Sequence, residues 1–268
     1  MYDFSYHKPA SLDAAAALLS ANEDYKLLAG GMSLIPSLKM RLARYPALVD
    51  LAAIGALRGI RRSDAVLEIG AMTPHAEVAA SAEVGRAIPA LASLAEGIGD
   101  PLVRNRGTIG GSIANADPAA DYPAALLGLG ATVATDRREI AADAFFLGLF
   151  ETALQPGEII TAIRFPIPQA AAYCKYSQPA SRFALVGVFA ARTAGGARVG
   201  VTGAAPCAFR WEAAERSLSQ RFEPEAIERL AVVPEGLNAD IHASAEYRAH
   251  CVAVLARRAV ASAHRAGA

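Results

Sequence analysis

Residues 103–121 read VRNRGTIGGSIANADPAAD, and this is the most unusual stretch of the chain. Its glycine pair at 110–111 stands where an extended segment changes direction, and a second pair at 30–31 follows a short strand predicted over residues 25–29. Glycine permits positive φ and close backbone approach, so successive N–H groups can converge on an anion. Two such loops could hold a diphosphate, although a single pair is more often only a tight turn.

Two acidic residues follow the glycine pair of this stretch. Asp117 and Asp121 could be catalytic carboxylates, ligands for ribose or ribityl hydroxyl groups, or turn and helix-cap residues. Because Pro118 suits the first position of a helix, Asp117 is best explained as an N-cap, whereas nothing local accounts for Asp121. Lys175 lies on an otherwise apolar strand, where it could contact a phosphate or a cofactor carbonyl, although an edge lysine that reaches solvent is the commoner case.

The composition is that of a globular chain without a nucleic-acid signature. Of its 268 residues 53% are hydrophobic, and 26 basic residues balance 26 acidic ones, so the basic excess that a phosphate backbone requires is missing. Three separate cysteines exclude a disulfide framework and a four-cysteine [2Fe–2S] site, and the histidines lack metal-ligand spacing. No targeting segment and no uncharged apolar run of roughly 18 residues is present. We therefore expect a cytoplasmic protein with no bound metal, no nucleic-acid partner and no membrane span.

The order of the predicted elements indicates an α+β fold. Short strands are predicted over residues 25–29, 47–54 and 65–71. Ser11 is expected to cap the helix before them, and Thr73 the helix after them, which would end near residue 85.

A change of pattern indicates a domain boundary near residue 168. Beyond it, strands are predicted over residues 183–191 and 197–205, joined by a glycine turn and followed by helices. The last helix is expected to begin after Ser244 and to bury one face. The residues expected on that face are Tyr247, Cys251, Val254 and Leu255.

Taken together, the two glycine loops resemble the paired FAD-binding signatures of the flavin subunits of molybdenum hydroxylases, of the aerobic carbon monoxide dehydrogenase and xanthine dehydrogenase types. The signatures are AGGMSLIPSLKMR at 29–41 and VRNRGTIGGSIANADPAAD at 103–121. Further similarity lies in IGAMT at 69–73, KYSQPASRFALVGV at 175–188 and SAEYRAHCVAVLARRAV at 244–260.

The resemblance implies a fold and its domains. Residues 1–168 would form a two-lobed FAD-binding domain of the vanillyl-alcohol-oxidase (PCMH) type, split near residue 55. Residues 169–268 would form a small C-terminal domain, similar to that of carbon monoxide dehydrogenase flavoproteins, with a three-stranded antiparallel sheet and helices.

The resemblance also implies which residues bind FAD. The two loops would wrap the diphosphate with backbone N–H groups, Asp121 would bind FAD hydroxyl groups, and Ile160 and Lys175 would lie near the adenine end and the flavin. Phe183 stands where relatives of the carbon monoxide type carry a Tyr against the isoalloxazine ring, so stacking is expected without the hydroxyl. Met32 stands where some relatives have His, and the loop is expected to bind through its backbone all the same. The implied cofactor-binding residues are Ala29, Gly30, Gly31, Met32, Ser33, Leu34, Ala71, Ile98, Val103, Thr108, Ile109, Gly110, Gly111, Ser112, Asp121, Ile160, Lys175 and Phe183.

In the family that the chain resembles, a large subunit oxidises the substrate at a molybdenum cofactor, two [2Fe–2S] clusters in a small subunit carry the electrons, and FAD hands them to the final acceptor. The resemblance therefore implies an oxidoreductase subunit with FAD, no catalytic side chain and no metal of its own, in a heterotrimer or its dimer. Two alternatives remain open: a stand-alone flavin oxidase or reductase of a small molecule, and a non-catalytic nucleotide-binding assembly module.

Overall fold

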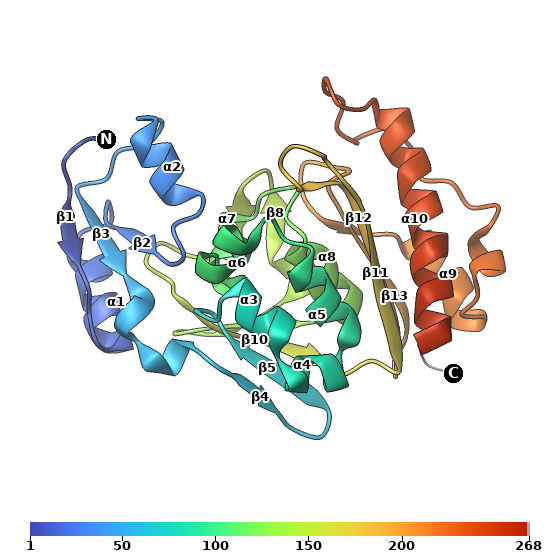
Figure 1. Cartoon of the computed structure of the whole chain (residues 1–268), viewed down its shortest axis with the longest axis horizontal. Coiled ribbons are helices and arrows are strands. Elements are labelled where there is room, and N and C mark those ends of the chain that lie inside the picture. Colours follow the sequence, from blue (N-terminus) through green and yellow to red (C-terminus); the bar gives the residue numbers. More distant parts are fainter. Residues whose placement is uncertain (267–268) are drawn as a thin grey trace.

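The computed structural model describes residues 1–266, which lie in three parts along the longest axis of the molecule (Figure 1). The N-terminal part is built on a parallel sheet with the strand order β1-β3-β2. Ser11 caps the first helix as predicted, because its side chain accepts a hydrogen bond from the Ala14 N–H at 3.2 Å. The elements are β1 (Ser5–His7), α1 (Leu12–Ala21), β2 (Lys26–Leu28), α2 (Leu34–Lys39), β3 (Ala47–Asp50), η1 (Leu51–Ala53) and η2 (Gly55–Leu57).

The middle part is an antiparallel sheet packed against a group of short helices. Its strand order is β4-β5-β10-β6-β7, and the central strand β10 pairs with β5 on one side and β6 on the other. The strands are β4 (Ile60–Arg62), β5 (Val66–Gly70), β6 (Thr132–Thr135), β7 (Glu139–Ala141) and β10 (Ile160–Pro166), with the hairpin β8 (Phe146–Gly148) and β9 (Glu151–Thr152) after the 3-10 turn η3 (Ala142–Ala144). The helices are α3 (His75–Ala80), α4 (Ala82–Ala87), α5 (Pro89–Glu96), α6 (Pro101–Arg106), α7 (Ile109–Asn115) and α8 (Tyr122–Leu129).

The C-terminal part is a second antiparallel sheet that lies between the middle helices and the last two helices (Figure 1). Its strands run in the order β11-β12-β13-β14. The elements are β11 (Ala170–Ser177), β12 (Ala184–Thr193), β13 (Gly196–Thr202), β14 (Phe209–Arg210), α9 (Glu212–Gln220), η4 (Pro224–Ile227) and α10 (Ala245–Ala266). A three-stranded sheet was expected, and within the described residues β14 adds a fourth strand of two residues, too short to give a sequence signal.

Helix α8 joins the middle part to the C-terminal sheet. Every residue of α8 is buried, and glycine allows the backbones to approach. A Cβ at Gly200 would collide with the carbonyl oxygen of Ala124 and lie 2.8 Å from the nitrogen of Gly128, and one at Gly128 would lie 2.8 Å from the carbonyl oxygen of Phe189. The main core therefore continues from the middle sheet through α8 to Phe189 and Ala191 on β12.

Three local predictions differ from the structure. Thr73 does not cap a helix, because its hydroxyl accepts from the N–H of Gly59 and donates to the carbonyl of the same residue. The single helix predicted up to residue 85 is two helices, since α3 starts after Pro74 and α4 starts after Ser81. Asp117 bonds the N–H of Ala119 within a turn, and no helix starts at that point.

The buried face of α10 differs in part from the predicted one, since Leu255 is buried and Cys251 packs against the core as expected. The predicted face included Tyr247, which is 46% exposed. The helix instead buries Arg248, whose guanidinium donates to the carbonyl oxygens of Leu185 and Gly203 at 2.7 and 2.9 Å. The interior carbonyls that hold this arginine come from β12 and the end of β13, so the helical pattern alone did not reveal them.

Candidate functional site

The two glycine loops meet, although 75 residues of chain separate them. A Cβ at Gly30 would collide with the carbonyl oxygen of Arg106 and lie 2.7 Å from the Cα of Gly107. Gly31 has a φ of 76°, a left-handed conformation that side chains rarely adopt. The first loop therefore depends on glycine both for its turn and for its contact with the second loop.

The second loop is fastened to the strand end at residues 71–73. The N–H of Ile109 donates to the carbonyl of Thr73 at 3.1 Å, and the N–H of Gly110 donates to the carbonyl of Ala71 at 2.8 Å. Thr108 caps α7, since its Oγ1 accepts from the N–H of Gly111 at 3.1 Å and its carbonyl from the N–H of Ser112 at 3.0 Å. The glycines here serve close packing, because a Cβ at Gly110 would lie 2.6 Å from the Cβ of Ala71.

The free backbone donors therefore lie mainly on the first loop. Within residues 1–266 no acceptor is found for the N–H groups of Gly30, Gly31, Met32, Ser33 and Thr108. These five donors surround the contact between the two loops. Grouped, unpaired N–H groups of this kind are suited to an anionic ligand.

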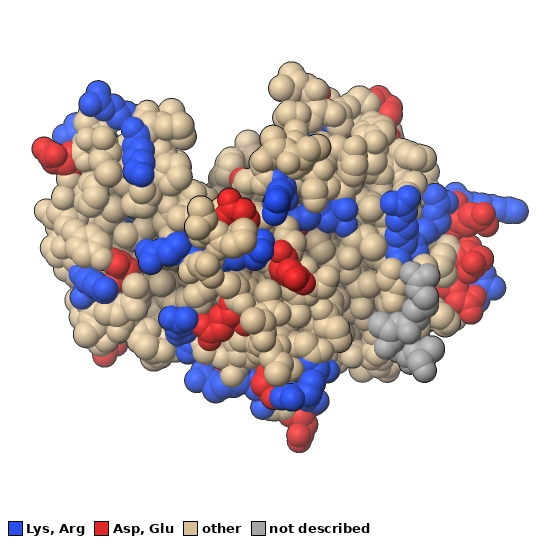
Figure 2. All heavy atoms as spheres, viewed as in Figure 1, with Lys and Arg blue, Asp and Glu red and all other residues tan. Residues whose placement is uncertain are grey.

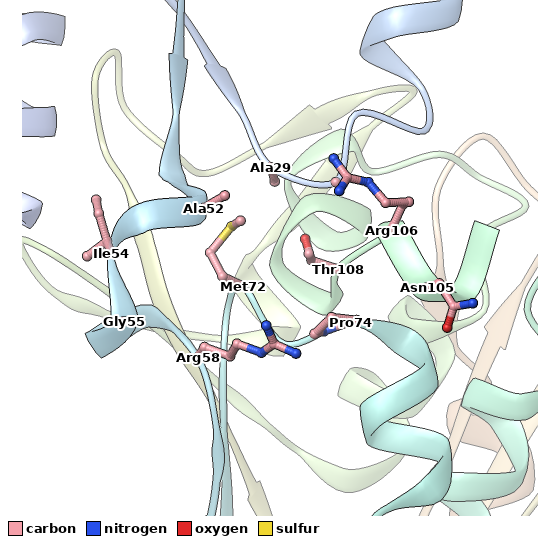
Figure 3. A pocket seen from close by; sticks show the side chains of 11 residues that line it. Ala29, Ala52, Ile54, Gly55, Arg58, Met72, Pro74, Asn105, Arg106 and Thr108 are labelled. Carbon is pink, nitrogen blue, oxygen red and sulfur yellow. The ribbon is translucent and has the colours of Figure 1, made fainter. Parts of the chain in front are cut away.

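A cavity of about 180 Å³ opens beside the loop contact. Figure 3 shows Arg58 and Arg106 on opposite sides of the space that Met72 and Thr108 border. Figure 2 shows a notch in the surface between the part that carries α2 and the middle part. The lining residues are Ala29, Gly30, Ala52, Ile54, Gly55, Arg58, Met72, Pro74, Asn105, Arg106 and Thr108.

A second group of polar residues lies beyond the other end of α6. The Nζ of Lys175 lies 2.9 Å from Oδ1 of Asp121, and the hydroxyl of Tyr173 donates to the same oxygen at 2.6 Å. Lys175 also donates to the carbonyls of Gly97 and Arg182 at 2.8 and 3.1 Å. Burial raises the pKa of Asp121, and the charge of Lys175 and the Tyr173 hydroxyl oppose this effect.

Helix α6 connects the two groups. Its last residue, Arg106, touches the first loop, while Arg104 donates to the carbonyls of Ile98 and Gly99 before its start, at 3.0 and 3.2 Å. Arg182 donates to the same Gly99 carbonyl at 3.2 Å, and the neighbouring Phe183 is 44% exposed. Six residues of α-helix span roughly 9 Å, so the site is elongated, with unpaired donors at one end and apolar and ionic groups at the other.

A buried histidine lies under the second loop. A Cβ at Gly107 would lie 2.7 Å from the Nε2 of His75, and the His75 ring lies 5.4 Å from that of Tyr122. Burial, helped by the nearby charge of Arg104, lowers the pKa of His75 from 6.5 to about 4. His75 is therefore neutral at physiological pH and supports the loop as an uncharged packing group.

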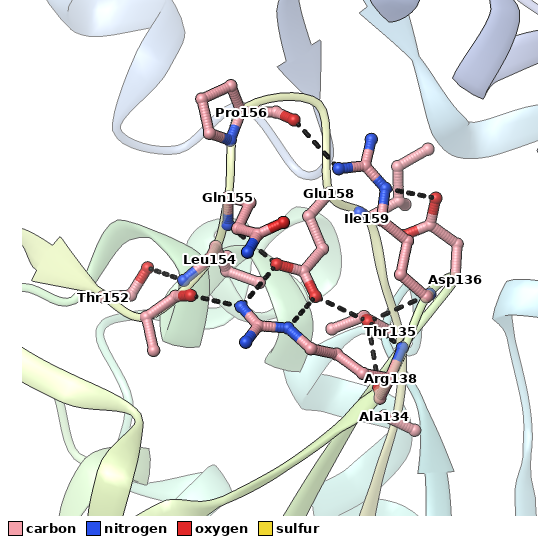
Figure 4. A network of polar contacts seen from close by, with 12 residues as sticks. Ala134, Thr135, Asp136, Arg138, Thr152, Leu154, Gln155, Pro156, Glu158 and Ile159 are labelled. Atoms are coloured by element: carbon pink, nitrogen blue, oxygen red, sulfur yellow. Dashed lines mark hydrogen bonds and ion pairs between the residues drawn. The ribbon is translucent and has the colours of Figure 1, made fainter.

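A network around Glu158 lies in the middle part, at the turn through which this part contacts the N-terminal part (Figure 4). Arg138 donates to the buried Glu158 carboxylate at 2.9 and 3.0 Å, and Thr135 and the N–H of Gln155 donate at 2.8 and 2.7 Å. These bonds fix the turn before β10, where Ile159 packs in one cluster with residues of α1 and β3. The hydrogen bond from Arg138 holds the pKa of Glu158 at about 2.

The comparisons with known proteins agree with this geometry. Residues 2–168 match the family model of the FAD binding domain in molybdopterin dehydrogenase. The chain is 36% identical to the carbon monoxide dehydrogenase medium chain of Hydrogenophaga pseudoflava, with 96% of each chain covered. The chain belongs to the FAD-binding medium subunits of the molybdenum hydroxylases. It is also 34% identical to the nicotine 6-hydroxylase medium subunit of Paenarthrobacter nicotinovorans, again over 96% of each chain.

Solved structures give the same assignment. A carbon monoxide dehydrogenase structure from Hydrogenophaga pseudoflava matches with a TM-score of 0.91 and 36% identity over 98% of both chains. Quinoline 2-oxidoreductase from Pseudomonas putida 86 matches with a TM-score of 0.89 and 30% identity, covering 99% of this chain and 98% of the other. The medium subunit is thus an oxidoreductase component whose cofactor is FAD, while molybdenum and iron–sulfur centres belong to other subunits.

Within residues 1–266 of this medium subunit, no group of three or more His, Cys, Asp or Glu side chains is placed to hold a metal ion. None of the helices in the same range is long and apolar enough to cross a bilayer.

The medium subunit brings most of the site residues expected from its sequence into two groups. Residues 29–34, Ala71 and residues 108–112 lie at the loop contact, and Ile98, Val103, Asp121, Lys175 and Phe183 lie toward the other end of α6. Ile160 is different, because its side chain is buried in the main core at the start of β10. Lys175 does not reach solvent as an edge lysine would, since its side chain is 8% exposed.

Sequence reasoning missed three residues of the site in this medium subunit. The hydroxyl of Tyr173 donates a hydrogen bond to Asp121. Its place in the site could have been predicted, because residues two apart on a strand lie on the same face and Tyr173 is two residues before Lys175. Arg106 directly precedes the second glycine loop, which is a local signal. Arg58 reaches the cavity from the segment before β4 and has no such signal.

Proposed function

We propose that this chain is the flavoprotein subunit of a molybdenum hydroxylase, in which bound FAD accepts electrons from the [2Fe–2S] clusters of a small partner subunit and passes them to a terminal acceptor. Its partners would be that iron–sulfur subunit and a large molybdenum subunit, in a heterotrimer or its dimer. Relatives named as a carbon monoxide dehydrogenase medium chain, a 6-hydroxypseudooxynicotine dehydrogenase complex subunit and a nicotine 6-hydroxylase medium subunit support this assembly.

The contact between the two glycine loops is the observation that carries the proposal. Five unpaired N–H groups and an arginine lie around a cavity that a Cβ at Gly30 would disturb. An FAD diphosphate fits this donor set, because it is anionic and accepts several hydrogen bonds at once. We assign diphosphate binding to residues 29–33 and Thr108, with the packing of Ile109, Gly110, Gly111 and Ser112 holding the second loop in place.

The remaining site residues would orient the rest of the cofactor. Asp121 would bind FAD hydroxyl groups and Lys175 would contact the flavin, each held in position by the other. Phe183 would stack against the isoalloxazine ring, and Ile98 and Val103 would supply apolar contacts. Ile160 is buried in the core, so near the adenine end it would act indirectly, by supporting the residues packed around it. No side chain is required as an acid or base on substrate, because the cofactor itself supplies the redox chemistry.

Two further assignments complete the proposal. Residues 1–168 would form the FAD-binding domain, of the vanillyl-alcohol-oxidase type and split near residue 55, and residues 169–268 the C-terminal domain. We propose a cytoplasmic location, together with the partner subunits.

Anaerobic mixing tests the electron relay. The FAD-loaded chain is mixed with the chemically reduced iron–sulfur subunit of the same complex, and the visible flavin band is followed. The band should bleach only when both proteins are present. A band that stays unchanged, although the two proteins co-purify, would contradict the relay and favour an assembly module. Turnover of a small alcohol or acid by the isolated chain would favour a stand-alone oxidase or reductase.

A further inference from the structure

Two arginines line the cavity at the loop contact, and they differ in what they bind. Arg58 is occupied by Glu77, since its Nε and Nη2 both donate to Oε2 of that carboxylate at 2.9 and 2.8 Å. The Arg106 guanidinium has no hydrogen-bond acceptor and no ion-pair partner within residues 1–266. None of the described residues that line the cavity is acidic. Arg106 therefore supplies a positive charge there that the chain does not neutralise.

The backbone of Arg106 is fixed against the first loop. Its carbonyl oxygen occupies the place where a Cβ of Gly30 would lie, and Figure 3 shows the guanidinium beside the backbone of that loop. The charge thus lies next to the unpaired N–H groups of residues 30–33.

Asp50, an acidic residue at the end of β3 in the N-terminal part, already has partners of its own. Asp50 accepts from the hydroxyl of Tyr6, and its other oxygen accepts from the N–H of Ala52 at 2.9 Å. The hydrogen bond to Asp50 raises the pKa of Tyr6, and the positive charge of Arg106 acts in the opposite direction. Asp50 and Arg106 nevertheless form no ion pair, so the guanidinium stays available to a ligand.

We propose that Arg106 binds the diphosphate of FAD and supplies the charge that the backbone loops lack; this inference rests on the proposed function. A guanidinium carries five N–H donors in a planar fork that matches two phosphate oxygens at once. Arg106 would then be a positioning residue for the diphosphate and would make no contribution to binding of the isoalloxazine ring. Ligands with a diphosphate should depend on Arg106, whereas riboflavin, which has none, should not.

The test is a binding series on the full chain, with the FAD dissociation constant measured from flavin fluorescence. Arg106→Gln should weaken FAD binding about tenfold to a hundredfold, the range expected when one charge-assisted hydrogen-bonding group is lost. ADP should lose its ability to displace FAD to a similar degree, and riboflavin binding should stay unchanged. Arg106→Lys should recover part of the loss, because the ammonium keeps the charge without the fork.

Arg62→Gln is the matched control, because Arg62 is an exposed arginine on β4 outside the cavity. It removes the same charge and should change FAD binding less than threefold. Measuring the FAD dissociation constant at several salt concentrations distinguishes the two variants further. Arg106→Gln should reduce the salt dependence of FAD binding, and Arg62→Gln should not.

The possible results distinguish a failure of the proposed role of Arg106 from a failure of the proposed function. FAD binding to Arg106→Gln with the wild-type constant would overturn the role of Arg106 alone. Equal weakening for FAD and riboflavin would also overturn it, because it would indicate a structural role. Failure of the wild-type chain to bind FAD, both alone and co-expressed with its partner subunits, would instead contradict the proposed function.

Discussion

The ammonium group of Lys175 lies 2.9 Å from the carboxylate of Asp121, and these side chains are 8% and 4% exposed. One residue belongs to β11 and the other precedes α8, so the pair fastens the C-terminal sheet to the middle part beside the site. Lys175 also bonds the carbonyls of Gly97 and Arg182, which belong to the two turns that flank the pair. The ion pair therefore joins three segments far apart in sequence.

Removing one partner of this pair should destabilise the protein strongly. We expect Lys175→Met to lower the free energy of unfolding by about 3 to 5 kcal/mol, because it leaves a buried carboxyl without its cation. The double variant Lys175→Met with Asp121→Asn should recover part of this loss. Urea unfolding measures both. The control is Glu212→Gln, which breaks an exposed ion pair with Arg216 and should lower the free energy of unfolding by less than about 1 kcal/mol. An equally small effect of Lys175→Met would show that the buried pair does not hold the sheet.

Gly30 should tolerate no side chain. Gly30→Ala places a methyl group on the carbonyl of Arg106, so the two loops must separate and FAD binding should fall at least tenfold. Flavin absorbance of the purified variant after FAD addition and desalting measures the loss. Gly85→Ala is the matched control, because a Cβ at Gly85 meets nothing within 4 Å and alanine favours the helix there. Full FAD retention by Gly30→Ala would mean that the loops do not need this contact.

The pH dependence of stability should show the buried His75. A histidine whose folded pKa of about 4 lies below its unfolded value of 6.5 takes up a proton more readily after unfolding. Its contribution is therefore complete above pH 6.5 and is lost as the pH falls toward 4, by up to about 3 kcal/mol. Thermal unfolding between pH 7 and pH 4 measures it. His75→Phe should make stability depend less on pH in this range, while replacement of the exposed His250 by Gln should leave the dependence unchanged. An unaltered pH dependence in His75→Phe would show that other groups cause the loss of stability in acid.

Glu158 should make stability depend on pH in a more acidic range than His75 does. Its folded pKa of about 2 lies below the ordinary value of 4.5, so it stabilises the folded state above pH 4.5 and loses this contribution as the pH falls to 2. At neutral pH, Glu158→Gln should cost about 2 to 3 kcal/mol, a figure reduced for the partial exposure of Arg138. Denaturant unfolding gives this value. FAD affinity should fall with it, because the network holds the turn that packs against the N-terminal part. A loss of stability below about 0.5 kcal/mol would contradict that role.

The local fold was largely predictable where one segment sets its own structure. Ser11 capped its helix as expected, and the predicted strands around residues 25–29, 47–54 and 65–71 all formed in part. Thr73 failed as a cap because a tertiary partner, Gly59, took its hydroxyl. Strand β14 was missed because two residues carry no periodicity.

The site was predictable to a similar extent and for a similar reason. The glycine pairs mark the loops, because close backbone approach requires glycine. The sequence does not show that Gly30 faces Arg106, or that Asp121 and Lys175 pair with each other, because those contacts join segments more than 50 residues apart. The family resemblance implies that backbone N–H groups of both loops bind the diphosphate, and four of the N–H groups of residues 108–112 have acceptors within the chain.

The most direct test of the central claim is an experimental structure of this chain with FAD bound, alone or within its complex. We expect the diphosphate at the contact between residues 29–34 and Arg106–Thr108, within hydrogen-bonding distance of the N–H groups of residues 30–33, and the isoalloxazine ring toward Lys175 and Phe183. A diphosphate bound away from both glycine loops would contradict it.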